Sequence, residues 1–469
     1  MDSTGGLSRP ATVSANGPKS SRNKSSRKLT TWSLAVAGVF GIGVSMAASQ
    51  PPKPRPLAAN DVSILFPAPR NAKDLTNLIA LSDLNGPAGS GRVWSDADFN
   101  GFLAIAEDPR FQVAKTDFPL QLPPEVKQID AWFIAGIRID PGAPGLSKEV
   151  IEQYGQQPQI RLIAQPVTRG PGGTIKVHDI AAHLIFSYSA SEKPAADLCL
   201  PRPKPDMAAF EPVIRDTVAL RDQLASGKFG KAKVNTAGPL NVHPGLVGAS
   251  AVPFRNALKG FLETHLASAR LSAMAVMGLH DPEPWIFIAM VKPAPGVVLP
   301  VQGPTLDGAQ IAQMLSRRTA DGRLEVVPAP ATNNQNPITC RHAALQKPPQ
   351  PVGERKGVAT AEFINGKASD ARVREIVDII ADPKKSHFFN TDCISCHTDT
   401  AQPLVRFKKN FKVAGVAPAV LPKEDWNVRN FGWFTSFLRG GPAVPTATRR
   451  TATETAEVVE FINRELLGK

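Results

Sequence analysis

The residues with the most distinctive chemistry in this chain stand together at Cys393-Ile394-Ser395-Cys396-His397. The spacing C-x-x-C-H allows each thiol to add across a vinyl group of one haem, and the adjacent imidazole then lies beside the iron as its proximal ligand. A bare C-x-x-C would also suit zinc or a thioredoxin-like redox pair, but the histidine that follows favours haem. We therefore expect one covalent haem c, held by Cys393, Cys396 and His397.

Two predicted helices flank this motif within residues 354–469. The first covers 370–381, where four branched apolar side chains share one side and an Asp-Pro pair then ends the helix. The second covers 451–467 and also carries an apolar stripe. Thr451 and Glu454 have the spacing of a capping box at its start.

A helix, C-x-x-C-H and a closing helix in the last quarter of the chain resemble a class I cytochrome c domain. The resemblance depends mainly on Cys393, Cys396 and His397. It implies thioether attachment at both cysteines, proximal ligation by His397 and one-electron transfer. The chain departs from the family at the other axial position, because neither a methionine nor a histidine follows His397.

Three alternatives remain for the sixth ligand of the iron. His387 precedes His397 on the same segment and would give a bis-histidine site. A side chain from the preceding part of the chain is the second alternative, and the candidates are Met277, His280, Met290 and Met314. The third alternative is a five-coordinate iron with an open face. For the methionines, ordinary core packing is the competing explanation.

Basic and aromatic residues after the motif extend this interpretation. The basic run is a candidate docking surface for an acidic redox partner, with a solvated helix face as the alternative; it comprises Arg406, Lys408, Lys409 and Lys412. The aromatic residues are expected to line a haem crevice or to form a simple core; they are Trp426, Phe431, Trp433, Phe434 and Phe437.

Residues 1–48 have the pattern of a secretory signal, in which a basic stretch precedes an apolar run and then small residues. The apolar run, 32–48, has 17 residues and is at the short limit for a spanning helix. We expect cleavage after it, with an uncleaved anchor in the inner membrane as the alternative. Export agrees with haem attachment, because bacterial c-type haem is attached outside the cytoplasmic membrane. A periplasmic location is therefore expected.

The two remaining cysteines, Cys199 and Cys340, are single and far apart. In an oxidising compartment they would form a disulfide, and two separate buried thiols are the alternative. His178 and His183 are five residues apart, which on one strand places them on opposite faces, so we expect no shared metal.

The chain has a formal net charge of +13, but residues 1–48 hold six basic residues and one acidic residue, which leaves about +8 for the remainder. This charge suits an acidic partner or an anionic membrane surface. Nucleic acid is not an expected partner of an exported chain.

Proline-rich segments at 49–57 and 346–353 predict a spacer and a linker. They would separate an α+β, strand-rich domain at 58–345 from a mainly helical, cytochrome c-like haem domain at 354–469. In the larger domain, the predicted strands cover 131–140, 159–165, 174–188, 271–279 and 285–291, and the predicted helices 211–225 and 253–269.

The sequence therefore predicts an exported mono-haem c-type cytochrome that transfers single electrons to a redox partner. A haem enzyme or ligand sensor with an open, peroxidase-like distal site is the first alternative. A periplasmic interaction protein with an accessory haem is the second. The motif indicates electron transfer more than catalysis, and the residues of 58–345 suggest no reaction.

Overall fold

The computed structural model describes residues 55–86, 91–108, 121–142, 157–190, 204–279, 285–300, 305–306, 309–310, 314–318, 324–328, 363, 366–386, 399, 431–435 and 442–468. Within them, eight antiparallel strands form one sheet in the order β1-β2-β3-β5-β8-β9-β10, and β4 pairs with β3. The strands are β1 (Ser63–Leu65), β2 (Trp132–Asp140), β3 (Gln159–Arg169), β4 (Ile175–Val177), β5 (Ile180–Ser187), β8 (Arg270–Leu279), β9 (Trp285–Ala294) and β10 (Val297–Pro300).

The two faces of this sheet differ in chemistry. Antiparallel partners that lie opposite one another project to the same face. Ile137 pairs with Leu162, and these side chains face the helices α4 (Met207–Ser226) and α5 (Ala251–Leu266). We call this the α5 face; α2 (Asp96–Glu107) packs on it through the contacts of Phe99 and Phe102 with Trp132.

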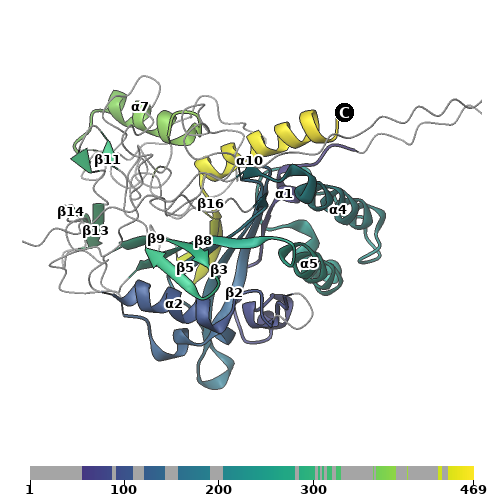
Figure 1. Ribbon diagram of the computed structural model, residues 1–469, viewed down its shortest axis with the longest axis horizontal. Coiled ribbons are helices and arrows are strands. Elements are labelled where there is room, and N and C mark those ends of the chain that lie inside the picture. The colour runs from purple at the N-terminus through teal and green to yellow at the C-terminus, as the bar shows by residue number, and fades with distance from the viewer. Residues whose placement is uncertain are drawn as a thin grey trace, which may run out of the picture. The chain divides into compact units, whose positions relative to one another are not determined.

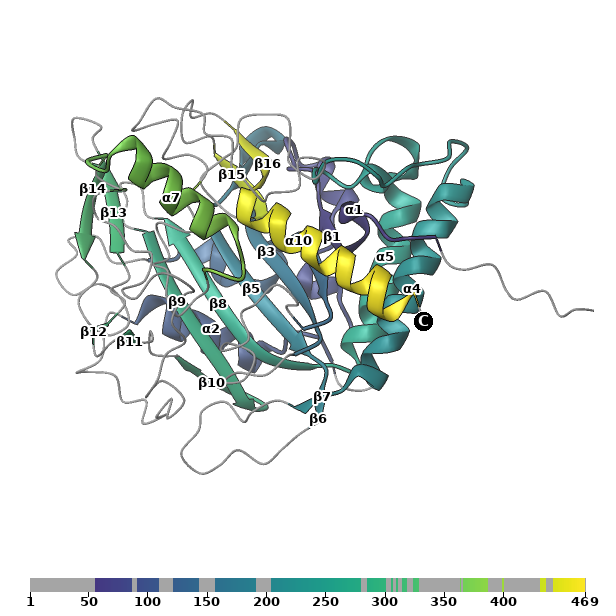
Figure 2. The same ribbon diagram turned by 90° about the horizontal axis from the view of Figure 1, so that it is seen from above.

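Arg138 pairs with Arg161 on the opposite face, which we call the α10 face. It carries α7 (Asp370–Ala381), α10 (Arg449–Phe461) and the pair β15 (Phe431–Thr435) with β16 (Ala443–Ala447). Figure 1 shows α7 and α10 on one side of the sheet and α2 on the other, and Figure 2 looks down on α7 and α10.

Shorter elements connect these layers. The short helices and the π-helical turn are α1 (Ala59–Val62), η1 (Asp74–Asn77), η2 (Leu81–Asp83), η3 (Pro124–Lys127), η4 (Ile129–Ala131), η5 (Pro171–Gly173), η6 (Pro244–Leu246), η7 (Gly248–Ser250) and η11 (Ile462–Leu466). The small strands are β6 (Ser189–Ala190), β7 (Lys204–Pro205), β11 (Thr305–Leu306), β12 (Ala309–Gln310), β13 (Met314–Arg318) and β14 (Leu324–Pro328).

The prediction of a mixed α+β fold with an antiparallel sheet is confirmed. The strand predicted over 131–140 is β2, and the helix predicted over 370–381 is α7 with the same bounds. The prediction of a single strand over 174–188 was wrong, because this segment forms two strands, β4 and β5. These strands pair with different parts of β3, and His178 and Asp179 lie between them.

The predicted start of the last helix was also wrong. Thr448, not Thr451, is the N-cap of α10, and its hydroxyl accepts a hydrogen bond from the Thr451 amide. Glu454 is therefore in the second turn of the helix, where it forms ion pairs instead of a capping box.

Residues Lys53–Lys469 form one compact unit. Phe431, Trp433 and Phe434 of β15 are buried in the same hydrophobic core as the main sheet, together with Val373 of α7 and Val458 of α10. The expected linker 346–353 lies outside the described residues, so a boundary there stays a prediction. The described elements on either side of it nevertheless share one core.

Candidate functional site

The four predicted haem-site residues, Cys393, Cys396, His397 and His387, lie outside the described residues. The nearest described residues on either side of the motif are Ser386 and Asp399. Both are buried, and Asp399 has no exposed surface. The site is therefore built from the contacts that hold these two residues.

Arg450, at the start of α10, holds the segment that leads into the motif. Its Nη1 donates hydrogen bonds to the carbonyl oxygens of Ser386 at 2.7 Å and of Ile380 at 3.1 Å, and to the Ser386 hydroxyl at 2.7 Å. The Nε of the same guanidinium binds Glu454 of α10. Arg450 thus joins α10 to the end of α7 through its contact with Ile380. Ser386, the last described residue before the motif, therefore lies beside the first turn of α10.

Arg449 provides a matching contact on the other side of the motif. Burial lowers the pKa of this arginine, and the carboxylates of Asp399 and Asp378 act in the opposite direction. Two acidic side chains thus lie close enough to Arg449 to stabilise its charge. Adjacent arginines of α10 therefore hold residues on both sides of the predicted haem-binding segment.

Buried charges also connect α10 to the sheet. Arg138 of β2 forms an ion pair with Glu454, and its Nε lies 4.0 Å from Asp140. Burial raises the pKa of Glu454, but the charges of Arg138 and Arg450 outweigh this effect and hold that pKa well below its usual range. Glu454 is therefore a carboxylate at neutral pH.

Arg161 lies beside this cluster on β3. Burial, followed by repulsion from Arg138, lowers its pKa, although Glu454 and Asp140 partly compensate. Within the described part of the chain, its Nε is buried and has no hydrogen-bond partner. Both carboxylates therefore act on Arg161 through their charge.

The pair β15–β16 fixes the position of α10 over β2 and β3. Gln165 donates to the carbonyl oxygen of Trp433 at 2.7 Å and accepts from its amide at 2.5 Å, which extends hydrogen bonding from the sheet to β15. The Phe431 ring packs on Gly136, where a Cβ atom would lie 2.6 Å from the ring. The aromatic residues expected near haem thus include three that form core contacts with the sheet.

The α10 face is less covered over the middle of the sheet. His183, Ile185, Ala273 and Ala275 project to it and are half-buried. Their neighbours that project to the α5 face are fully buried, among them Leu184, Met274 and Val276. His183 is therefore half-buried on the same face of the sheet as Arg138 and Arg161.

The predicted sixth-ligand candidates divide between the two faces. Met277 pairs with Ala181 and projects to the α10 face, whereas Met290 pairs with Met274 and projects to the α5 face. Both methionines are buried in the core. His280 and the side chain of Met314 lie outside the described residues.

His178 and His183, which the sequence analysis considered as metal ligands, have different positions in the fold. His178 precedes β5 and hydrogen bonds with Thr168 at 2.7 Å, while His183 lies within β5. Burial, followed by the charge of Lys176, lowers the pKa of His178 to about 4. Among the residues that the structure describes, no group of three metal-binding side chains was found.

Other predicted features also fall outside the described residues. They are the candidate anchor 32–48, Cys199, Cys340, the basic run Arg406, Lys408, Lys409 and Lys412, and the aromatic residues Trp426 and Phe437. No helix in the described part is long and apolar enough to cross a membrane.

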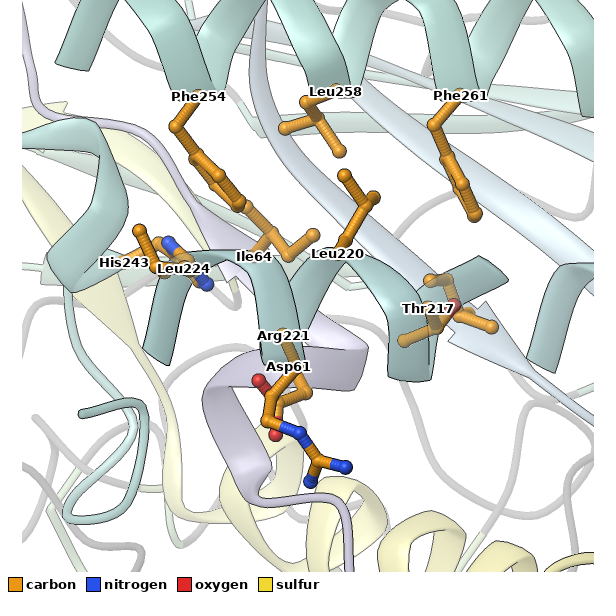
Figure 3. Close-up of a pocket in the computed structure, with 11 residues that line it drawn as sticks. Asp61, Ile64, Thr217, Leu220, Arg221, Leu224, His243, Phe254, Leu258 and Phe261 are labelled. Atoms are coloured by element: carbon orange, nitrogen blue, oxygen red, sulfur yellow. The ribbon is translucent and has the colours of Figure 1, made fainter. Parts of the chain in front are cut away.

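A small cavity lies between α4, α5 and β1. Figure 3 shows Phe254, Leu258 and Phe261 pointing from α5 toward Thr217 and Leu220 of α4. Its volume is about 10 Å³, which holds at most one water molecule. The cavity therefore has no room for a ligand.

Sequence reasoning missed Arg449, Arg450 and Arg161, and it considered His183 only as a metal ligand. The signal for Arg161 and His183 was present: each is a polar residue within a strand that is otherwise mostly apolar. Strand pairing was needed to place them on one face. Comparisons with protein families, with curated proteins and with solved structures found no match.

Proposed function

We propose that this chain is an exported mono-haem c-type cytochrome that transfers single electrons. The C-x-x-C-H motif carries the proposal, because Cys393 and Cys396 supply two thiols for one haem and His397 supplies a ligand beside them. A bound haem supplies a reversible one-electron redox centre at its iron.

The described residues around the motif fit such a group. Arg450 holds Ser386 before the motif, and Arg449 interacts electrostatically with Asp399 after it. A porphyrin needs an apolar surface, and Ile185, Ala273 and Ala275 on the α10 face are apolar and half-buried. The half-buried guanidinium of Arg161, with its buried Nε, suits the carboxylates that a haem carries.

The proposed roles of the chain's residues follow from this arrangement. Cys393 and Cys396 bind the haem covalently, and His397 ligates its iron. Arg449 and Arg450 position the segment. The proposed docking surface for an acidic partner is the run from Arg406 to Lys412, and export by residues 1–48 brings the chain to the periplasm or anchors it in the inner membrane.

The test is expression of the full chain in a bacterium with a c-type haem maturation system. Haem should remain on the chain through denaturing electrophoresis, and the double variant Cys393→Ser, Cys396→Ser should lose it. Cys199→Ser is the matched control and should keep it. A wild-type chain that releases all its haem on denaturation would contradict the proposal.

The same preparation separates electron transfer from ligand chemistry. A ferrous protein that does not bind carbon monoxide, and that is reduced and reoxidised without consuming peroxide, supports an electron carrier. Rapid carbon monoxide binding with peroxide turnover would instead support the haem enzyme or sensor. Cell fractionation tests the periplasmic location directly.

A further inference from the structure

Residues 223–262 contain five basic residues and no acidic residue. This stretch runs from the end of α4 into α5, and Figures 1 and 2 show these two helices side by side. Lys228, Lys231 and Lys233 are exposed in the loop that follows α4. The stretch itself supplies no carboxylate to compensate them, so the loop carries an excess of positive charge.

The acidic residues at the two borders of this stretch are paired with other cations. Asp222 accepts a hydrogen bond from Nε of Arg221 at 2.8 Å, and it lies 3.8 Å from a guanidinium nitrogen of Arg55. Glu263 forms an ion pair with Lys259 at 2.6 Å. The charge of the three loop lysines therefore faces solvent.

Packing holds this loop against the beginning of α5. The rings of Phe229 and Phe254 have centroids 5.6 Å apart, and both side chains are buried. A Cβ atom added at Gly230 would lie 3.7 Å from the Cα atom of Ser250, so the two backbones are also close. The loop with its exposed lysines and the segment 247–253 therefore form one surface.

Exposed apolar side chains lie on the same surface as these lysines. The described part of the chain has three exposed large hydrophobic side chains, and two of them are Val247 and Val252, with exposed fractions of 48% and 44%. The residues between them, 248–251, have small side chains. We call the following set the lysine–valine surface: Lys228, Lys231, Lys233, Val247 and Val252.

The end of the N-terminal segment lies next to this surface. Arg221, one turn before the end of α4, donates a hydrogen bond to the carbonyl oxygen of Arg55 at 2.7 Å. Lys228 follows the same end of the helix. The chain that precedes Arg55 contains the apolar run 32–48, for which the sequence predicts a signal or a membrane anchor. That chain therefore joins the fold at the end of α4 from which the lysines project.

We propose that the lysine–valine surface binds a bilayer that carries anionic headgroups. Lysines interact with anionic headgroups, and apolar side chains beside them enter the boundary between headgroups and acyl chains. The junction with the N-terminal segment favours a membrane over an acidic protein as the partner. This inference goes beyond electron transfer and does not require a bound haem.

The experiment measures amide hydrogen exchange in the full chain with an excess of vesicles. One set contains phosphatidylglycerol and phosphatidylcholine in equal parts, and the other contains phosphatidylcholine alone. Peptides covering 227–234 and 246–253 should exchange more slowly with the anionic vesicles than with the neutral ones. Binding through 32–48 would be common to both sets, so the difference reports the lysine–valine surface. Added salt should reduce it, because salt screens exposed charges.

The triple variant Lys228→Gln, Lys231→Gln, Lys233→Gln should lose this protection. Each lysine near an anionic surface contributes roughly a fivefold gain in partitioning, so the three together contribute about 100-fold. The matched control removes three exposed positive charges elsewhere and should keep the protection; it is Lys73→Gln, Arg169→Gln, Lys176→Gln. Val247→Ser with Val252→Ser keeps the charge and should lose part of the protection. All these positions are exposed, so thermal unfolding should match the wild type.

The inference is overturned if both kinds of vesicle give the same exchange in these peptides, or if the control triple loses as much protection as the lysine triple. Protection by soluble polyglutamate but not by anionic vesicles would also overturn it, because the surface would then bind an acidic protein. None of these outcomes affects covalent haem attachment, so failure here and failure of the proposed function are distinguishable.

Discussion

Arg138 and Glu454 form a partly buried ion pair although 316 residues separate them in sequence. Arg138 belongs to β2 and Glu454 to α10, so the pair joins the central sheet to the helix that holds both sides of the predicted haem-binding segment. Glu454 also binds Arg450, which reaches Ser386. A continuous set of polar contacts therefore connects β2 with the entry to the motif.

Replacement of Glu454 by glutamine should strongly destabilise the protein. The change leaves the buried guanidinium groups of Arg138 and Arg450 without their anionic partner, and breaking such a pair from one side costs about 3 kcal/mol or more. Urea unfolding of the full chain measures this loss. Glu460→Gln is the control, because Glu460 pairs with Arg464 at an exposed position, and its unfolding curve should match that of the wild type.

The same carboxylate should contribute to acid sensitivity. Its pKa is lowered in the folded state, so its stabilising contribution is complete above its unfolded value near 4.5 and is lost as the pH falls below that value. The free energy of unfolding of the wild type should therefore decrease below about pH 5. Glu454→Gln should decrease less steeply over this range, and equal slopes would contradict the assignment.

Gly136→Ala should loosen β15 from the sheet. The new Cβ atom would lie 2.6 Å from the Phe431 ring, which would have to move, and such overpacking costs about 1–3 kcal/mol. Gly260→Ala is a control of opposite sign. Gly260 lies on α5 with nothing within 4 Å of an added Cβ atom, so better helix propensity should stabilise the protein by about 0.5–1 kcal/mol. Thermal unfolding of the two variants should shift in opposite directions.

Local sequence patterns predicted individual elements well and long-range arrangement poorly. The apolar spacing and terminal Asp-Pro of 370–381 are local signals, and they gave the bounds of α7. Thr451 and Glu454 have the local spacing of a capping box, yet Thr448 caps α10. The competing force was tertiary, because Arg138 on a distant strand binds Glu454.

In the candidate site too, local sequence identified some residues, whereas others could be found only from the long-range arrangement of the chain. Two thiols and a histidine in one short motif identify their chemistry without a fold. The positions of His183 and Arg161 depend on the pairing of β3 with β5 and on which face α10 covers, and neither can be read from strand periodicity alone. Trp433, one of the aromatic residues expected in a haem crevice or a simple core, packs against the sheet, where Gln165 and the Phe66 carbonyl bind it.

His243 should produce a second pH dependence. Burial lowers its pKa from 6.5 to about 3, so the unfolded chain binds a proton between these values that the folded chain does not. Stability should therefore fall as the pH decreases from about 6.5, by up to about 1.4 kcal/mol per pH unit from this group.

His243→Asn should remove that part of the slope while it keeps an acceptor for the Gly245 amide. Phe254→Leu is the control, since Phe254 stacks on His243 with ring centroids 4.6 Å apart. It should lower stability without changing the slope. Denaturant unfolding at a series of pH values between 4 and 7 compares the three proteins, and an unchanged slope in His243→Asn would rule out this histidine as the source.

Arg450→Lys should release the segment before the motif without removing the positive charge. A lysine ammonium can replace the charge beside Glu454, but it cannot also reproduce the forked contacts with the carbonyl oxygens of Ile380 and Ser386. Amide hydrogen exchange in peptides covering 381–386 should become at least about tenfold faster, which corresponds to a loss of about 1.4 kcal/mol in local stability. Arg464→Lys, on the exposed end of the chain, is the matched control and should leave these peptides unchanged. Equal protection in Arg450→Lys and the wild type would show that the contacts of Ser386 do not depend on the guanidinium, and that α10 does not hold the motif in the way proposed.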